Sequence, residues 1–341
     1  MCMSAVGADV CWQPTATLES LKQAAHLRRA VRQWMHDEHI LEVCTPPLSF
    51  AATTDPQVHS IVVDSACVDG SQAKEMTRRY LHTSPEFAMK RMLCAYPGTD
   101  IYQIATVFRA EEQGRFHTSQ FSMLEWYRTG MDHEALMQDV ERLLQYLWKS
   151  FGLDFLAVSK RSYCEEVFNR IGDWPDKLSG VVIRDYFQRA RRSFPDGLEA
   201  DVSASLDLFM DEFVIPDFDP ASVTVLCDYP GSQAALARVA LNNEGIEVAS
   251  RFEVFVGQVE LANGFHELTD SEVQRRRFEN DLEARKSSGK PVVPMDENLL
   301  AALEFGLPDC AGIALGIDRL HMVLGGYQHI NQVVSFSDDN A

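Results

Sequence analysis

Closely spaced cysteines are absent from this 341-residue sequence, because none of its eight cysteines belongs to a C-x-x-C pair. Zinc sites and redox-active dithiols need such pairs, and disulfide frameworks are typical of small secreted chains. We therefore expect reduced, mostly buried thiols and no cysteine-bound metal. The cysteines are Cys2, Cys11, Cys44, Cys67, Cys94, Cys164, Cys227 and Cys310.

Long hydrophobic runs and a secretion signal are also lacking. No apolar stretch approaches the roughly 18 residues that a membrane-spanning helix needs. The first lysine is Lys22, so the N-terminal segment lacks the basic start of a signal peptide. We expect a cytoplasmic protein without a membrane partner.

Positive charge is scarce. The chain has 31 Lys and Arg against 50 Asp and Glu, which gives a formal net charge of -19 at pH 7. Such a chain repels nucleic acid at long range, although a local basic patch could still bind it. We therefore expect tRNA to be an unlikely partner, whereas a basic protein surface or a cationic small molecule fits the charge better.

The pattern of apolar residues predicts an α+β fold. Strand-like runs rich in β-branched and aromatic residues alternate with helical periods, and many strands adjoin through hairpin-like connections. We expect an antiparallel β-sheet flanked by helices, with a helical insertion at about 160–220. The expected strands lie at 40–43, 61–63, 79–81, 101–109, 120–127, 223–230 and 247–268, and the expected helices at 18–39, from 83 onward, 132–149 and 271–287.

The stretch 108–127, FRAEEQGRFHTSQFSMLEWY, is the first segment that indicates chemistry. Two strand-like runs enclose a long loop, on which arginines and aromatic rings can hold phosphates and a base. In the second run the period of two places Glu125 and Tyr127 on one face of the sheet. The alternative interpretation is a surface hairpin with solvated charges. We disfavour it because two further segments indicate the same chemistry.

The second segment is RFEVFVGQVELANGFHELTD, in which Glu253, Glu260 and Glu267 recur every seven residues. If Val256 and Gly257 form the centre of a hairpin, Glu253 lies directly opposite Glu260. Like charges in that position destabilise a sheet, so a cation between them is expected, and oxygen ligands beside phosphate favour Mg²⁺. Alternatively, the two side chains extend into water at an exposed edge.

The third segment, GIALGIDRL, predicts an apolar strand that runs into a helix. Gly316 allows the backbone to approach a bulky ligand, and Arg319 in the first helical turn can reach a phosphate or lie flat against a base. Small residues also occur where a helix packs closely on a sheet, and by itself such a short glycine pattern is a weak signal.

Together the three segments resemble motif 2, the substrate strand and motif 3 of class II aminoacyl-tRNA synthetases, specifically the lysyl-tRNA synthetase branch. The segment EVCTPPL, with Pro46, resembles motif 1, which shapes the dimer interface in that family. The resemblance implies a single class II catalytic domain over residues 1–341 and a homodimer. Lysyl-tRNA synthetases carry an anticodon-binding OB domain before motif 1, and only a short segment precedes the first expected helix here. We expect that module to be missing.

A free-standing core of this kind is similar to the elongation factor P lysine lysyltransferase family. The resemblance implies that ATP activates (R)-β-lysine, or lysine, as an aminoacyl-adenylate, which is transferred to a lysine of elongation factor P. By the same resemblance, Arg109 and Arg319 are catalytic, and Mg²⁺ assists. The implied amino-acid contacts are Ser84, Pro85, Glu86, Glu125, Tyr127 and Glu267; the ATP contacts are Arg109, Ala110, Glu111, Thr118, Phe121, Glu260, Leu261, Gly316 and Arg319; the metal ligands are Glu253 and Glu260.

One position of this chain agrees with the lysyltransferase family, and one loop segment differs from it. Ala314 stands where lysyl-tRNA synthetases usually have glycine and the lysyltransferases have alanine, which favours β-lysine as the substrate. In contrast, the family's H-N-P-E-F is here His117-Thr118-Ser119-Gln120-Phe121, so the tip of the motif 2 loop departs from the pattern.

Two other functions remain open on this evidence. A truncated lysyl-tRNA synthetase would use the same chemistry with tRNA as acceptor, which the acidic charge and the expected lack of an OB domain disfavour. A non-catalytic, synthetase-like binding or regulatory subunit would have no physical need of Arg109, Arg319 and the three glutamates.

Overall fold

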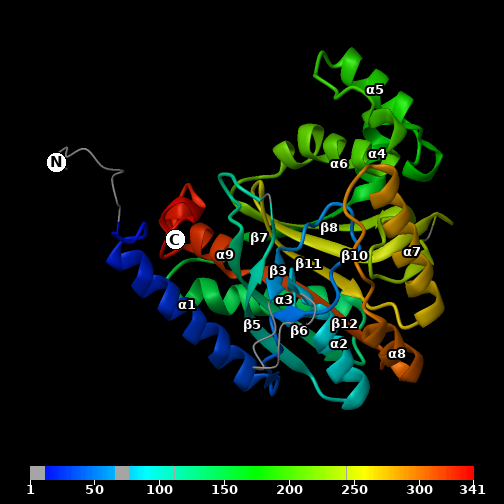
Figure 1. Ribbon diagram of the computed structural model, residues 1–341. Helices are drawn as coiled ribbons and strands as arrows, with labels where there is room; N and C mark the ends of the chain where they lie inside the picture. The colour runs from blue at the N-terminus through cyan, green and yellow to red at the C-terminus, as the bar shows by residue number, and fades with distance from the viewer. Residues whose placement is uncertain (1–11, 66–76, 111, 243) are drawn as a thin grey trace, which may run out of the picture.

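A nine-stranded sheet forms the centre of the protein, and helices cover it (Figure 1). The computed structural model describes residues 12–65, 77–110, 112–242 and 244–341. The expected α+β fold is confirmed. In spatial order the strands are β1 (Leu41–Glu42), β5 (Ile101–Phe108), β6 (Gln120–Thr129), β12 (Cys310–Gly316), β11 (Val259–His266), β10 (Glu247–Val256), β8 (Ser222–Pro230) and β7 (Ala157–Ser162), and β9 (Val239–Leu241) pairs with β10.

The middle of this sheet is antiparallel, as expected, whereas β1 pairs with β5, and β7 with β8, in parallel. Strands β5 and β6 are antiparallel neighbours and form the predicted hairpin with a long loop. A small second sheet joins β2 (Leu48–Ser49), β4 (Thr77–Leu81) and β3 (Val62–Ser65). Since β6 and β12 are neighbours, the first and third segments singled out in the sequence lie side by side.

One face of the sheet carries the main hydrophobic core. Three helices pack there: α1 (Leu18–Asp37), α3 (His133–Ser150) and α9 (Ile317–Gly325). The period of two sends Leu124 and Trp126 of β6 into this core, and their neighbours in the strand to the opposite face. The predicted separation of the two faces of β6 is therefore confirmed.

The opposite face is covered in part by α2 (Glu86–Ala95), α7 (Ser271–Ser287) and α8 (Glu297–Gly306), which share a cluster with Tyr127. The boundaries of α7 agree with the sequence prediction. Helix α8 was not predicted. It follows the proline-containing linker 289–294, and Asp296 caps its first turn by accepting from the Leu299 amide at 2.9 Å.

Residues between β7 and β8 form the expected helical region, with α4 (Tyr163–Ile171), α5 (Gly180–Arg189) and α6 (Val202–Phe213) at one end of the sheet (Figure 1). These helices enclose a separate aromatic core against β8 and β10. Short 3-10 helices complete the chain: η1 (Pro175–Lys177), η2 (Leu198–Ala200), η3 (Ile215–Asp217), η4 (Gly231–Gln233), η5 (Ile330–Gln332) and η6 (Asp338–Asn340).

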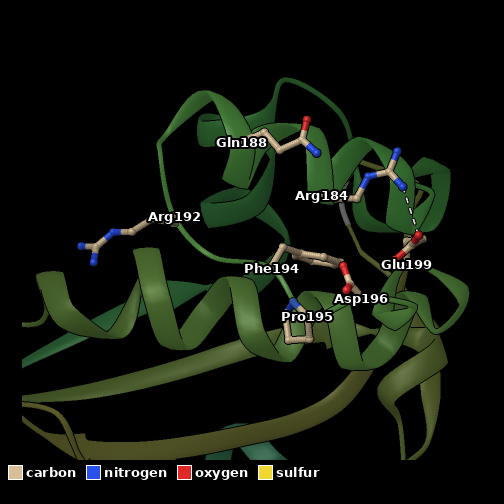
Figure 2. A pocket seen from close by; sticks show the side chains of 7 residues that line it. All are labelled: Arg184, Gln188, Arg192, Phe194, Pro195, Asp196 and Glu199. Carbon is tan, nitrogen blue, oxygen red and sulfur yellow. Dashed lines mark hydrogen bonds and ion pairs between the residues drawn. The ribbon is translucent and has the colours of Figure 1, made fainter.

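A surface hollow of ≈ 250 Å³ lies within this helical region (Figure 2). Its lining is polar and includes Arg184, Arg192 and Glu199, and the guanidinium of Arg184 donates to Glu199 at 3.0 Å. None of the predicted site residues lines it. The hollow therefore does not coincide with the site predicted from the sequence.

The cysteines follow the expectation in the part of the chain that the structure describes. Five cysteines there are free, and all except Cys44 are buried. Within those residues, no helix is both long and apolar enough to cross a bilayer.

Candidate active site

A hydrogen-bonded group of carboxyl and hydroxyl side chains lies where β6 meets the start of α2. The Tyr127 hydroxyl donates to Glu125 Oε1 at 2.7 Å, and the Ser84 hydroxyl donates to Glu125 Oε2 at 2.6 Å. Ser84 Oγ also accepts from the Glu86 amide at 3.0 Å, and Pro85 is the N-cap of α2. The four consecutive residues Thr83 to Glu86 thus bring the predicted amino-acid contacts onto the carboxylate of β6.

A buried lysine joins two further carboxylates to this group. Lys90 Nζ lies 2.6 Å from Glu86 Oε1 and 2.6 Å from Glu267 Oε2, and the lysine side chain is only 2% exposed. We call Glu86, Glu125, Glu267 and Lys90 the carboxylate cluster. Because a charge out of water is stable only when it is paired, these contacts hold Glu86 and Glu267 on one ammonium, whereas Glu125 is held by the hydroxyls of Ser84 and Tyr127.

Burial and mutual repulsion shift the titration of this cluster. Burial, and after it the charge of Glu86, raises the pKa of Glu125 to about 8, against the lowering effect of its two hydroxyl donors. Burial raises the pKa of Glu267 to about 7, although Lys90 opposes the shift. Burial alone would lower the pKa of Lys90, but the two glutamates together raise it, so the lysine stays charged. The cluster therefore has the strongest need for cations when its glutamates are ionised.

Gly312 has no side chain, which lets Tyr127 and Glu267 lie directly against its strand. A Cβ atom at Gly312 would overlap the Tyr127 ring and lie 2.5 Å from Glu267 Oε1. Ala314, two residues further along β12, pairs in register with Glu125. Small residues on β12 thus allow Tyr127 and Glu267 to approach the neighbouring strand.

The predicted nucleotide contacts gather at the other end of the β5–β6 hairpin. Arg109 Nε donates to the Thr83 carbonyl at 3.4 Å, and its guanidinium lies over the Phe121 ring, 5.2 Å from the centroid. Burial, and then the charge of Arg319, lowers the pKa of His117, so its imidazole is neutral at pH 7. The loop therefore connects the carboxylate cluster with the segment that carries Arg319.

Arg319 is held by both neighbouring segments. Its Nε donates to the Phe116 carbonyl at 3.1 Å, and its Nη1 donates to the carbonyl and to Oε2 of Glu260, each at 3.1 Å. The side chain of Glu260 remains 41% exposed. The arginine predicted to bind phosphate or base is thus fixed between motif 2 and β11, and Glu260 neutralises it.

The remaining predicted ATP contacts are placed less uniformly. The Ala110 amide donates to the His59 carbonyl at 2.8 Å, and Thr118 is buried. The Leu261 side chain packs into the main core, so only its backbone faces the region of Gly316. Glu111 lies outside the described residues.

The predicted register of the glutamate hairpin is wrong. The turn is centred on Gly257 and Gln258, since Val256 pairs with Val259, and Gly257 adopts a φ of 55°. The pairing then shifts by one residue, so that Phe255 pairs with Glu260 and Val254 with Ala262. Such a bulge places two residues opposite one. As a result, Glu253 lies opposite Asn263 instead of Glu260.

Glu253 and Glu260 nevertheless lie on the same face of the sheet. Glu253 and Phe255 are two residues apart on β10 and so point to one face, and Glu260 is the partner of Phe255 on β11. Each carboxylate contacts an arginine: Arg251 Nη2 donates to Glu253 at 2.6 Å, and Arg319 contacts Glu260. Burial raises the pKa of Glu253, Arg251 opposes the shift, and the charge of Glu260 adds to it. Each of the two carboxylates is thus paired with a guanidinium of its own.

The two carboxylates fit Mg²⁺ under one condition. Mg²⁺ is usually bound by one or two carboxylates together with substrate phosphates. Across the described ranges, no group of three His, Cys, Asp or Glu residues is arranged to hold a metal ion. Glu253 and Glu260 therefore suit Mg²⁺ when nucleotide phosphates complete the ligand set.

Gly316 provides a test of the nucleotide position. A Cβ there would meet Arg319 and the Leu261 carbonyl at 3.8 Å, which is ordinary contact, so the empty protein has room for alanine. We expect Gly316→Ala to keep its melting temperature and to raise the KM for ATP about 10- to 100-fold, because the methyl group displaces the nucleotide. ATP–pyrophosphate exchange and thermal unfolding measure the two effects. Unchanged ATP kinetics would place the nucleotide away from Gly316.

Sequence reasoning missed three charged residues that contact the predicted site. Lys90 stands four residues after Glu86 on a predicted helix, and this spacing indicates an ion pair. Arg251 precedes Glu253 by two positions on one strand, and this spacing predicts that the two side chains lie on the same face of the sheet. Asp338, which binds the motif 2 loop, has no local signal because its partners are distant in the chain.

Comparisons with known proteins agree with this geometry. The family described as tRNA synthetases class II (D, K and N) matches residues 12–340. A protein of Vibrio parahaemolyticus serotype O3:K6, named elongation factor P--(R)-beta-lysine ligase, is 40% identical over 328 residues, which cover 95% of this chain and 97% of the relative. Proteins with the same name from Vibrio cholerae (39% over 325 residues; 95% and 97% covered) and Edwardsiella ictaluri (39% over 330 residues; 97% and 98% covered) are also similar.

The sheet, the hairpin loop with Arg109 and the β12–α9 segment with Arg319 define a class II synthetase core. The chain belongs to the class II tRNA synthetase family (D, K and N), in the branch that contains the elongation factor P--(R)-beta-lysine ligases. Membership of this family implies the use of ATP.

Proposed function

We propose that the protein activates (R)-β-lysine with ATP and transfers the β-lysyl group to a lysine side chain of elongation factor P. The name of the similar Vibrio and Edwardsiella proteins supports both the amino acid and the acceptor. In this chain itself, the carboxylate cluster is the observation that supports the proposal. When all its groups are ionised, the cluster has three carboxylates and one ammonium, which contacts Glu86 and Glu267, and this leaves two negative charges for the two ammonium groups of β-lysine.

In the first proposed step the carboxylate oxygen of β-lysine attacks the α-phosphorus of ATP. The new O–P bond gives the aminoacyl-adenylate, and the bond to pyrophosphate breaks. Arg109 bridges the attacking carboxylate and the α-phosphate, while Arg319 and Phe121 hold the nucleotide. The rate then depends on charge stabilisation and on the alignment of the two substrates.

In the second step an uncharged lysine amine of the acceptor protein attacks the activated carbonyl. A C–N bond forms, AMP leaves, and the amine loses one proton. No nucleophile of this chain is needed, because the acceptor supplies it. Mg²⁺, held by Glu253, Glu260 and the phosphates, would offset the negative charge of the nucleotide.

The proposed assembly is a homodimer, in keeping with the resemblance of Pro46 and its neighbours to motif 1, and the proposed location is the cytoplasm, where translation factors work. We also propose a single catalytic domain for residues 1–341, with the helical region between β7 and β8 as an insertion. Its acceptor is a protein and not tRNA, as the name of the relatives supports.

The test separates activation from transfer. Pyrophosphate exchange is measured with (R)-β-lysine, (S)-β-lysine, L-lysine and ornithine, and transfer of labelled β-lysine is measured with elongation factor P and with tRNA. We expect exchange to be fastest with (R)-β-lysine and label to appear only in the protein. Label on tRNA would favour a lysyl-tRNA synthetase, and no exchange with any basic amino acid would favour a non-catalytic subunit.

A further inference from the structure

The tip of the motif 2 loop is tied to the C-terminal end of the chain. Thr118 Oγ1 donates to Asp338 Oδ1 at 2.8 Å, and the Ser119 amide donates to Asp338 Oδ2 at 2.9 Å. Both carboxylate oxygens of Asp338 are therefore used on two adjacent loop residues. Burial would raise the pKa of Asp338, but these hydrogen bonds lower it, so the carboxylate is charged at neutral pH.

The contact reaches the nucleotide site through the backbone of one residue, Ser119. The Ser119 carbonyl accepts from the Arg109 amide at 2.9 Å, at the base of the loop. The backbone at Ser119 is thus held on one side by Asp338 and on the other by the residue predicted to bind the α-phosphate. An anchored peptide there restricts the positions that Arg109 can take.

The C-terminal segment that carries Asp338 is itself held in place. The Ser337 amide donates to Thr15 Oγ1 at 2.8 Å, the Thr15 amide donates to the Ser335 carbonyl at 2.9 Å, and Asn340 Nδ2 donates to the Gln13 carbonyl at 2.7 Å. The C-terminal end lies beside the start of α1 (Figure 1). Asp338 therefore binds the loop from an anchored segment.

The loop contacts the same end of the chain a second time. Arg115 Nε donates to the Gln328 carbonyl at 2.9 Å, and the Arg115 carbonyl accepts from the Ile330 amide at 2.9 Å. These contacts hold the outer part of the loop, whereas Asp338 holds the strand that returns from it. Loss of Asp338 alone should therefore loosen residues 118–120 without releasing the whole loop.

The residues at the loop tip of this chain allow this contact. The resembled families have Asn-Pro-Glu where this chain has Thr118-Ser119-Gln120. Proline has no N–H, so it could not make the Ser119 hydrogen bond. The hydroxyl of Thr118 supplies the second donor.

We propose that Asp338 is a positioning residue for ATP activation, which holds the motif 2 loop, and through it Arg109, in the orientation that binds nucleotide. The proposal rests on the proposed function for its kinetic readout. Asp338 contacts loop residues and no reacting atom, so its effect should appear in the use of ATP and not in the use of β-lysine.

Asp338→Ala is the test variant, and Asp339→Ala, at the exposed neighbouring position, is its matched control. In pyrophosphate exchange we expect Asp338→Ala to raise the KM for ATP roughly tenfold or more and to change the KM for β-lysine less than twofold. Asp338→Asn, which keeps one acceptor oxygen, should give an intermediate KM. Equal changes in both KM values, or no change in either, would overturn the proposal.

Two further measurements test the contact itself, and the second of them does not depend on activity. Thr118→Val removes one donor and keeps the side-chain shape, and the double variant with Asp338→Ala should be no worse than Asp338→Ala alone, since both act through one contact. Amide hydrogen exchange of residues 116–121 should accelerate in Asp338→Ala and stay unchanged in Asp339→Ala. If the unaltered protein shows no pyrophosphate exchange, the proposed function fails, whereas unchanged amide exchange in Asp338→Ala refutes the loop contact itself.

Discussion

Lys90→Met should lower the free energy of unfolding by about 3–5 kcal/mol near neutral pH, which is the usual loss when one partner of a buried ion pair is removed. The substitution leaves Glu86 and Glu267 facing each other without the ammonium that lies 2.6 Å from each. Methionine fills a similar volume, so the loss reports charge and not packing. Urea unfolding followed by circular dichroism measures it.

Arg91→Met is the matched control, because Arg91 is the exposed next residue of the same helix, and its free energy of unfolding should change by less than about 0.5 kcal/mol. The double variant Lys90→Met/Glu267→Gln should recover part of the lost stability, since one of the unpaired carboxylates is then neutral. As the pH falls through about 7, the pKa of Glu267, the deficit of Lys90→Met should shrink, because this carboxyl takes up a proton and no longer needs the ammonium. A Lys90→Met protein as stable as the Arg91→Met control would mean that the cluster is hydrated.

The affinity for the doubly protonated form of β-lysine should increase about tenfold from pH 7 to pH 9 through Glu125. The pKa of this carboxyl in the empty site is raised to about 8, so at pH 7 most molecules carry a proton there. A bound ammonium favours the carboxylate, and binding must therefore release that proton. Calorimetry at pH 7.5 in two buffers of different ionisation enthalpy measures the released proton directly.

Glu125→Gln should abolish this proton release and weaken β-lysine binding about 10- to 150-fold, the equivalent of one charge-assisted hydrogen bond of roughly 1.5–3 kcal/mol. The amide can still accept from Tyr127, so the fold should persist. ATP binding to the same variant is the internal control and should not change. Proton release that persists in Glu125→Gln would assign it to Glu267, whose pKa is raised to about 7.

The same shift has a consequence for stability. The pKa of Glu125 is higher in the folded protein than in the unfolded chain, so its contribution to stability is complete at acid pH and is lost as the pH rises through about 8. Between pH 6 and 8.5 the melting temperature of the unaltered protein should fall more steeply than that of Glu125→Gln. Parallel pH profiles would show that Glu125 is ionised throughout this range.

Local patterns were sufficient for much of the fold and part of the site. The β5–β6 hairpin, the helix Ser271–Ser287 and the shared face of Glu125 and Tyr127 follow from periodicity and turn residues, which involve only neighbours in the chain. The strand register of the glutamate hairpin could not be predicted from such local patterns. A one-residue difference in the turn and an extra residue on β11 moved the β11 partner of Glu253 from the predicted Glu260 to Asn263. Both strands also pair with a second neighbour, β10 with β8 and β11 with β12, which a local pattern does not include.

The sequence by itself determined which residue types this protein has for its chemistry: arginines and aromatic rings on one loop, glutamates in the second segment, and a strand with small residues that runs into a helix. Only the tertiary structure decided which charges meet. Lys90 neutralises Glu267, and Asp338 holds Ser119 from 219 positions away. The order of strands in the sheet and the packing of α2 and of the C-terminal segment on it create these contacts, and no short-range pattern encodes that order.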